Sequence, residues 1–168
     1  MTSIDKLKSN ISSGLARSNR YKVLFHTKSE VLNLFCDSVG MPGRQIFTDE
    51  RQTKMATGKI AYGFGSEDVP ISFLLTNDWK AWDFIYDWHS KIITNLGNID
   101  NIQVDYKFNY MEDIEIQHLG VDGNPKKRIL LKNAFPTTLN AIELGNGNEN
   151  EVIRVETEFS YDNWEMIS

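Results

Sequence analysis

Few residues of this 168-residue chain have the types and spacing that support catalysis or metal binding. The three histidines, His26, His89 and His118, lack the spacing of a zinc site. The single cysteine, Cys36, has no second thiol with which to form a disulfide or a metal framework. No serine lies in a Gly-x-Ser-x-Gly turn, so no nucleophile for acyl transfer is visible. We therefore predict no catalytic residue, no metal ligand and no cofactor.

Carboxylates are the only groups numerous enough for acid–base chemistry. Adjacent pairs occur at 49–50 and 67–68, and three more carboxylates fall within 112–115. Two of them could act as acid and base, as in glycoside hydrolysis, if they lay about 5–10 Å apart. Solvated acidic turns explain the same residues equally well. An enzyme is thus an alternative interpretation, and it would show perturbed carboxyl titrations.

Aromatic residues are concentrated in TNDWKAWDFIYDWHSKIITNLGN, residues 76–98. Its first three residues can cap a helix, and Gly97 can end one. At 100° per residue most apolar side chains share one half of that helix. The pattern predicts packing on a sheet, since base stacking would also need a basic groove. The predicted packing residues are Trp79, Trp82, Ile85, Tyr86, Ile92 and Ile93.

Two aromatic residues of this helix, Phe84 and Trp88, lie at or beyond the edge of the apolar half. We expect them to contact a neighbouring chain or a surrounding protein. We expect Trp82, by contrast, to hold the helix on the sheet, so that Trp82→Ala costs roughly 3–5 kcal/mol.

The rest of the chain has the alternation of strands. A hairpin is predicted from 21–26 and 30–37, and the further predicted strands are 69–76, 102–110, 112–120, 126–134 and 151–161. The polar segment 44–68 exceeds an ordinary connection and suggests a functional loop or an extended hairpin. The predicted fold is a single, mainly β domain (1–168): an antiparallel β-sandwich or barrel with one flanking α-helix and a long extended hairpin loop.

Charge and hydropathy restrict the partners. The net charge is −5, which disfavours binding of the whole surface to nucleic acid or to anionic membranes. The N-terminus lacks the apolar core of a signal peptide, and no apolar run approaches a bilayer span, so we expect no membrane partner. Residues 1–20 carry a narrow helical stripe that should dock on the body or on a neighbouring chain, formed by Ile4, Leu7, Ile11 and Leu15.

Four stretches, taken in their order and spacing, resemble the tail tube protein of contractile-tailed bacteriophages. They are ARSNRYKVLF (16–25), FCDSVGMPGRQI (35–46), VPISFLLTNDWKAWDFIYDWHSKI (69–92) and LKNAFPTTLNAIELGNGNENEVIRVETEFSYDNWE (131–165). The tubes of type VI secretion and related contractile injection systems share that family's fold. The charge-rich segment 44–68 and the Asp-Gly-Asn-Pro turn within 121–125 depart from the family pattern and leave the contacts between rings open.

The resemblance implies a structural protein without catalytic residues or cofactor. Its copies would form six-fold rings that stack into a hollow conduit for DNA inside a contractile sheath. The implied partners are the sheath protein, the baseplate and tail-terminator proteins, and the tape-measure protein and genomic DNA in the lumen. The implied location is the virion tail, assembled in the host bacterial cytoplasm.

Within this interpretation the segment 41–66 is the candidate for ring stacking, with cross-ring charges at Arg44, Asp49, Arg51 and Lys54. The candidate lumen-facing residues are Asp113, Glu115, Glu156 and Glu158. A type VI or extracellular injection tube and a tube-initiating baseplate protein are alternatives of the same class. A β-sandwich carbohydrate-binding module is a distant alternative, which predicts a monomer whose tryptophan fluorescence is quenched by sugar.

Overall fold

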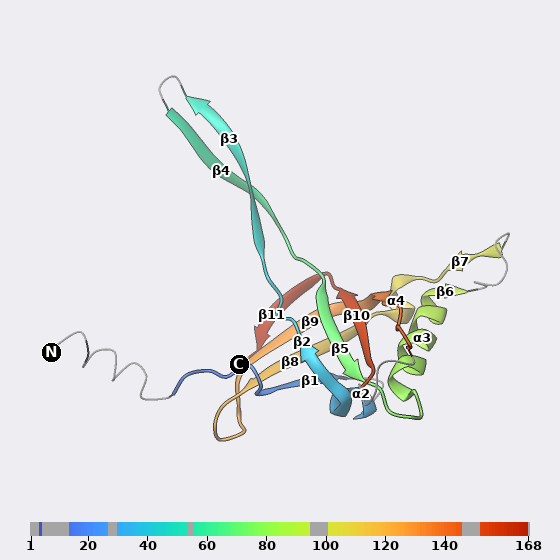
Figure 1. Ribbon diagram of the computed structural model, residues 1–168. Helices are drawn as coiled ribbons and strands as arrows, with labels where there is room; N and C mark the ends of the chain where they lie inside the picture. Colours follow the sequence, from blue (N-terminus) through green and yellow to red (C-terminus); the bar gives the residue numbers. More distant parts are fainter. Residues whose placement is uncertain are drawn as a thin grey trace.

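Most strands of the protein join into one bent antiparallel sheet. The computed structural model (Figure 1) describes residues 4, 14–26, 30–53, 56–94, 101–145 and 152–167. The strands of the sheet are β1 (Tyr21–Phe25), β2 (Cys36–Val39), β5 (Val69–Leu74), β8 (Glu112–Leu119), β9 (Pro125–Leu139), β10 (Arg154–Ser160) and β11 (Asn163–Ile167). Their order is β1-β8-β9-β10-β5-β2, and β11 also pairs with β9.

The long strand β9 divides the sheet into two halves that face each other. Its residues 125–134 pair with β8, whereas residues 135–139 pair with β10. Asn133 lies where the register shifts and has a left-handed backbone, with φ of 55°. The ring of Phe25 on β1 lies 6.1 Å from that of Phe73 on β5 and 5.9 Å from that of Phe159 on β10. These contacts across the interior confirm the predicted antiparallel sandwich or barrel.

Side-chain alternation in β10 shows why the strand occupies a half-buried position. Val155, Thr157 and Phe159 are buried, and the residues between them are exposed. An alternation of period two places one set of side chains in the core and the other in water. Residues 151–161 are therefore correctly predicted as a strand, although β10 begins at residue 154.

The helix α3 (Lys80–Ile92) covers one end of the core, but its buried face is only partly the predicted one. Ala81, Ile85 and Trp88 are buried, whereas Tyr86 is 46% exposed. The indole of Trp88 donates a hydrogen bond to the Tyr110 carbonyl over 2.7 Å, which satisfies its one polar atom inside the core. The expectation that Trp88 meets a neighbour is therefore wrong.

The outer side of α3 carries an aromatic stack. The Trp82 and Tyr86 rings lie 5.0 Å apart and are nearly parallel, and Trp79 meets Trp82 edge to face at 6.3 Å. Ile92 packs partly buried against the core, and Ile93 already begins the short strand β6 (Ile93–Thr94). Tyr86 thus does not clamp the helix to the sheet, and Trp82 stacks on Tyr86 instead.

Two predicted strands are largely helical. Residues Glu30–Phe35 form α2, so the hairpin predicted from 21–26 and 30–37 does not exist, and β1 pairs with β8 while β2 pairs with β5. Helical turns place Leu32 in the core, and Asn33 Oδ1 accepts the Phe25 N–H over 2.9 Å. The range 102–110 likewise divides into β7 (Gln103–Val104) and α4 (Lys107–Tyr110).

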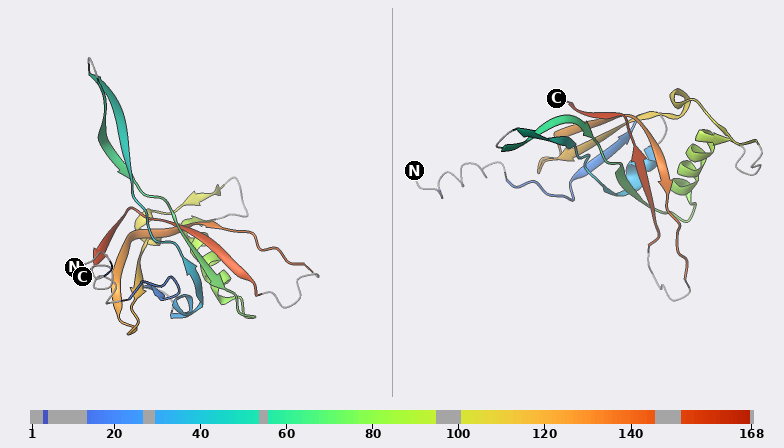
Figure 2. Two further views of the ribbon diagram at one scale, coloured as in Figure 1. Left: turned by 60° about the vertical axis from the view of Figure 1, so that its left-hand side comes forward. Right: turned by 90° about the horizontal axis from the view of Figure 1, so that it is seen from above.

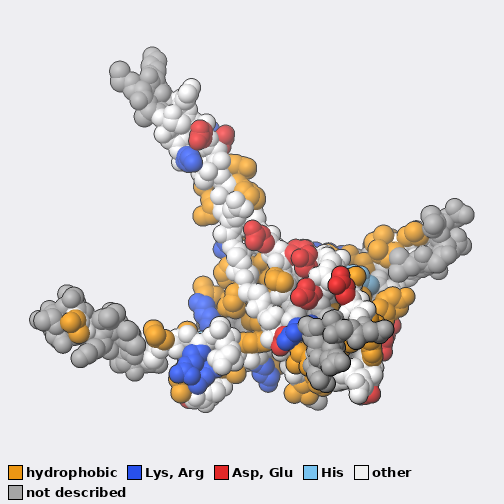
Figure 3. Space-filling model, in the orientation of Figure 1, with side chains coloured by type: hydrophobic (Ala, Val, Ile, Leu, Met, Phe, Trp, Pro, Cys, Tyr) orange, Lys and Arg blue, Asp and Glu red, His pale blue; other side chains and the backbone are white. Residues whose placement is uncertain are grey.

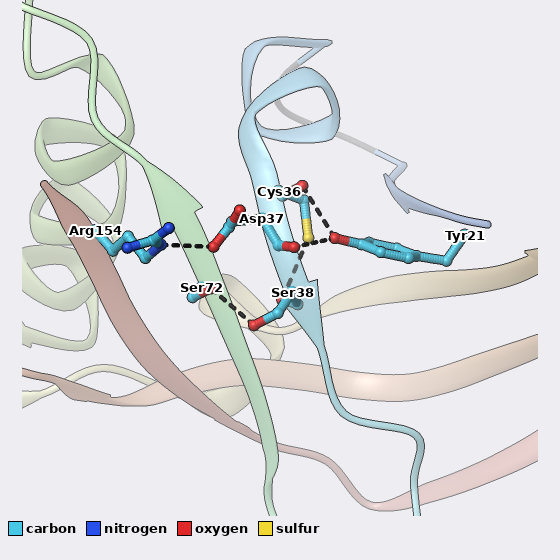
Figure 4. A network of polar contacts seen from close by, with 6 residues as sticks. All are labelled: Tyr21, Cys36, Asp37, Ser38, Ser72 and Arg154. Atoms are coloured by element: carbon cyan, nitrogen blue, oxygen red, sulfur yellow. Dashed lines mark hydrogen bonds and ion pairs between the residues drawn. The ribbon is translucent and has the colours of Figure 1, made fainter. Parts of the chain in front are cut away.

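Side chains close the opening between the two edge strands, β1 and β2 (Figure 4). The Tyr21 hydroxyl on β1 donates to the backbone carbonyls at the start of β2, including that of Asp37. Other side-chain contacts of β2 reach the strands on its opposite side: the Asp37 carboxylate accepts from Arg154 Nε of β10 over 2.7 Å, and the Ser38 hydroxyl lies 2.8 Å from that of Ser72 on β5. The sheet is therefore nearly a barrel, closed at one point by side chains rather than by a strand ladder.

A separate two-stranded sheet projects from this body. It consists of β3 (Gln45–Thr53) and β4 (Ala56–Gly65), and Figures 1 and 2 show it extending far from the other elements. This element is the predicted long extended hairpin. No helix in the described part of the chain is both long and apolar enough to cross a bilayer.

Candidate assembly surfaces

The β3–β4 hairpin presents uncovered apolar side chains. Phe47 stacks on Tyr62 with ring centroids 6.1 Å apart, and Ile60 lies further along the same strand as Tyr62. Tyr62 is 72% and Ile60 is 49% exposed. Figure 3 shows hydrophobic side chains along the hairpin and charged ones nearer its far end.

Two glycines of β4 leave space for the Phe47 ring on one side of the hairpin. Gly63 pairs directly with Phe47, and a Cβ added at Gly65 would lie 2.6 Å from the Phe47 ring. The ring therefore occupies space that any side chain at position 65 would need. We name the surface formed by Phe47, Ile60 and Tyr62 the apolar face of the hairpin. The sequence patterns did not predict this face, although the glycine alternation Gly63-x-Gly65 beside aromatic residues was a visible signal.

The base of the hairpin is attached to β11. The Arg44 guanidinium carbon lies 5.2 Å from the Phe64 ring centroid and 4.7 Å from that of Trp164. The Trp164 indole N–H donates to the Gly43 carbonyl over 3.2 Å. Burial raises the pKa of the neighbouring Tyr161, and the positive charge of Arg44 acts in the opposite direction. Arg44, predicted as a cross-ring charge, therefore contacts aromatic rings of its own chain.

Two of the other predicted charges of the hairpin, Asp49 and Arg51, are exposed. Asp49 and Arg51 lie on β3, and Glu50 between them is 3.9 Å from Lys59 on β4. This pair is exposed on both sides, so it contributes little to the stability of the free chain. Lys54 lies outside the described residues.

The acidic residues predicted to face a lumen fall into two groups. Glu156 and Glu158 project from β10 into solvent, and the Thr138 hydroxyl on β9 donates to Glu158 over 3.3 Å. A cavity of about 330 Å³ follows the same face and is lined by Ser38, Pro70, Ser72, Asn140, Glu156 and Glu158, among others.

Glu115 does not project into solvent, although it was predicted beside these residues. Its side chain is 3% exposed, and Arg128 Nε donates to it over 2.6 Å. His26 Nε2 lies 3.5 Å from its other oxygen. The hydrogen bond from Arg128 lowers the pKa of Glu115, with a further contribution from Gln117 and opposition from burial. Glu115, a predicted lumen-facing residue, is thus buried within the subunit, because Arg128 of β9 covers its carboxylate.

Asp113, the fourth of these residues, is half-buried and accepts the Asn133 backbone N–H over 3.0 Å. It thereby supports the left-handed bend of β9. Asn133 in turn donates from Nδ2 to Asp162 over 2.8 Å. Asp113 therefore accepts a hydrogen bond within its own subunit, at the bend of β9.

Further exposed apolar residues lie away from the hairpin. Tyr106 and Phe108 at α4 are 84% and 80% exposed, and Val104 on β7 is 68% exposed. Of the N-terminal stripe, Ile4 and Leu15 are 61% and 74% exposed, while Leu7 and Ile11 lie outside the described residues. Uncovered apolar area of this extent is typical of protein–protein contact.

Metal ligands are not grouped in the described parts of the chain. No three His, Cys, Asp or Glu side chains come together there in a way that could hold an ion. Burial, reinforced by the neighbouring Asp37 charge, raises the pKa of the Cys36 thiol to about 12, so the thiolate is scarce at neutral pH.

Solved structures from an extracellular contractile injection system and from the anti-feeding prophage are similar to this chain. The chain resembles one from the sheath/tube terminator of an extracellular contractile injection system, PVC, with 18% identity and a TM-score of 0.69 over 92% of this chain and 97% of the other. It resembles one from the PVC sheath–tube complex with 18% identity and a TM-score of 0.63 over 100% and 99%. It also resembles one from the tube-terminating cap of the anti-feeding prophage, with 18% identity and a TM-score of 0.70 over 92% of this chain and 91% of the other.

The TM-scores of 0.63 to 0.70 establish a common fold at this low identity, and no curated protein matches the sequence. Family membership rests on the sequence itself. The sequence model of one family, described as phage tail tube protein, matches residues 7–167, which is nearly the whole chain. Together with the projecting hairpin and the antiparallel body, this match shows that the chain belongs to the phage tail tube protein family.

Proposed function

We propose that copies of this chain form six-fold rings that stack into a hollow tube, and that the apolar face of the β3–β4 hairpin carries the contact between rings. The observation behind this proposal is the uncovered two-stranded hairpin. A lone hairpin is marginally stable in water unless a third strand or another layer covers its apolar side. The hairpin has no such cover in the free chain, and a neighbouring copy supplies one in the tube.

Charges at the far part of the hairpin suit the same role. We assign Asp49 and Arg51, and Lys54 beyond the described residues, to contacts with the next ring. Because β3 carries charges of both signs, a wrong register would place like charges together. The charges therefore select the register, and the apolar face contributes most of the binding energy. Residues 1–20, with the exposed Leu15, are the second docking segment.

The exposed face of β10 is the proposed lumen wall. Glu156 and Glu158 alternate there with buried residues, and serine and threonine hydroxyls lie beside them. An acidic, hydroxyl-rich wall repels the phosphate backbone and lets DNA pass without binding. The proposed partners are the sheath, baseplate and tail-terminator proteins outside and at the ends, and the tape-measure protein and genomic DNA inside. The proposed location is the virion tail, assembled in the bacterial cytoplasm.

Electron microscopy of the purified chain over a concentration series tests this proposal. Wild-type protein is expected to form six-fold rings and hollow tubes. Tyr62→Ser removes an exposed aromatic ring from the apolar face and should raise the concentration needed for tubes, whereas Tyr62→Phe, the matched control, should not. Because the side chain is 72% exposed, monomer melting should stay unchanged with Tyr62→Phe and fall only slightly with Tyr62→Ser, by the loss of the stack on Phe47. A wild-type chain that stays monomeric, or tubes equally abundant with Tyr62→Ser, would contradict the proposal.

A further inference from the structure

The hairpin meets the body through two short connections, residues 40–44 and 66–68. Short connections without a strand ladder can bend, because each residue contributes two soft backbone torsions. A projecting arm on two such links would point in many directions. The contacts at these links therefore decide whether the hairpin has one direction.

The first connection is held at successive points. The Gly40 N–H donates to the Pro70 carbonyl over 2.8 Å, and a Cβ at Gly40 would lie 2.8 Å from the Pro70 ring. The Gly43 carbonyl then accepts the Trp164 indole N–H. On the second connection, Asp68 accepts from the Thr137 hydroxyl over 3.3 Å.

Arg44 is the point at which three separate segments meet. It ends the first connection, and its guanidinium lies over Phe64 of β4 and Trp164 of β11. Trp164 is itself fixed, because β11 pairs with β9 opposite Leu131 and the indole packs against the core. A planar guanidinium stacks on aromatic faces, and tryptophan is the most favourable partner. One side chain thus joins both strands of the hairpin to the body.

We propose that Arg44 is a positioning residue that locks the β3–β4 hairpin at one angle to the sheet. The guanidinium of Arg44 thus contacts two aromatic side chains of its own subunit and does not form a charge contact with the next ring of subunits. One consequence rests on the proposed function: in a tube, a hairpin of fixed direction sets the offset between stacked rings. The lock itself is a property of the free chain.

Distances between two spin labels in the unassembled chain test the lock. We would place labels at Gln52→Cys on the exposed part of β3 and at Lys127→Cys on β9, in a Cys36→Ser background. Serine keeps a donor for the Ser38 carbonyl, which Cys36 contacts at 3.5 Å. A locked hairpin gives a single narrow distance peak.

Arg44→Ala should lose the narrow peak and give a broad distribution. Arg51→Ala is the matched control, since it removes the same charge from β3 without touching the base, and it should keep the narrow peak. Trp164→Phe keeps a ring but loses the N–H to Gly43, and it should broaden the peak less than Arg44→Ala. Far-ultraviolet circular dichroism confirms that each variant is folded.

A broad peak in the parent chain, or a narrow peak in folded Arg44→Ala, would overturn the lock. Neither result concerns tube formation, because the labels report on monomers. Conversely, absence of tubes from the wild-type chain would overturn the proposed function and leave the label distances unchanged. The two failures are therefore distinguishable.

Discussion

Replacing Trp88 should destabilise the free subunit far more than replacing Trp82, although both lie on α3. Trp88 is 1% exposed, and it meets Phe84 and Phe159 at ring distances of 6.0 and 5.9 Å. Truncation of a buried aromatic side chain to alanine costs about 3–5 kcal/mol. For Trp88→Ala we expect the upper half of that range, because the hydrogen bond to the Tyr110 carbonyl is lost as well.

Trp88→Phe separates the two contributions. It retains an aromatic ring against Phe84 and Phe159 but removes the indole N–H from the Tyr110 carbonyl. Loss of a donor to a buried carbonyl costs about 1–3 kcal/mol. Trp82→Ala, in contrast, breaks the stack on the exposed Tyr86, and aromatic pairs contribute about 0.5–1.5 kcal/mol beyond buried area. We expect about 1–2 kcal/mol for Trp82→Ala.

Urea unfolding below the assembly concentration measures these differences, with light scattering to confirm monomers. With an m value of about 2 kcal/mol per M, a loss of about 4 kcal/mol lowers the midpoint by about 2 M. Since native proteins are stable by only about 5–15 kcal/mol, Trp88→Ala should be marginally folded. A loss for Trp82→Ala equal to that for Trp88→Ala would refute the assignment of the buried face.

Two further perturbations test the polar contacts of the sheet. The Arg128 hydrogen bond lowers the pKa of Glu115, so its ionisation stabilises the fold above the ordinary value of 4.5 and this contribution is lost as the pH falls through the lowered pKa. Glu115→Gln should therefore flatten the acid limb of the stability profile in thermal melts, whereas Glu156→Gln on exposed β10 should not. Asn133 adopts φ of 55°, so Asn133→Ala should cost about 1–2 kcal/mol in urea unfolding. Asn133→Gly should cost less, and equal losses would contradict backbone strain as the cause.

Local sequence patterns determined much of the architecture. Alternation of period two located β5, β8, β9 and β10, because a strand with one buried face requires it. The glycine-containing polar segment 44–68 indicated the extended hairpin by its length alone. The helix at residues 80–92 followed from its periodicity. The predicted polar cap was wrong, because Trp79 occupies the N-cap without a side-chain cap hydrogen bond, and Gly97, the predicted end, lies outside the described residues.

Other features were decided only when distant segments met. The helical wheel placed Trp88 at the edge of the apolar half, but the Tyr110 carbonyl, 22 residues away, supplied the partner that lets its indole enter the core. Residues 30–35 are as apolar as a strand, and the place available for Leu32 beneath β1 favoured a helix. Short apolar runs are compatible with both structures, so tertiary packing decides between them.

The candidate assembly surfaces were likewise predicted in part from sequence and decided in part by the tertiary structure. Sequence identified the hairpin and its exposed charges Asp49 and Arg51, since a polar segment of that length has few other uses. It could not reveal that Arg44 lies between Phe64 and Trp164 or that Arg128 covers Glu115. Both pairings depend on strand register across the sheet, and register is a property of the folded chain that local sequence does not specify.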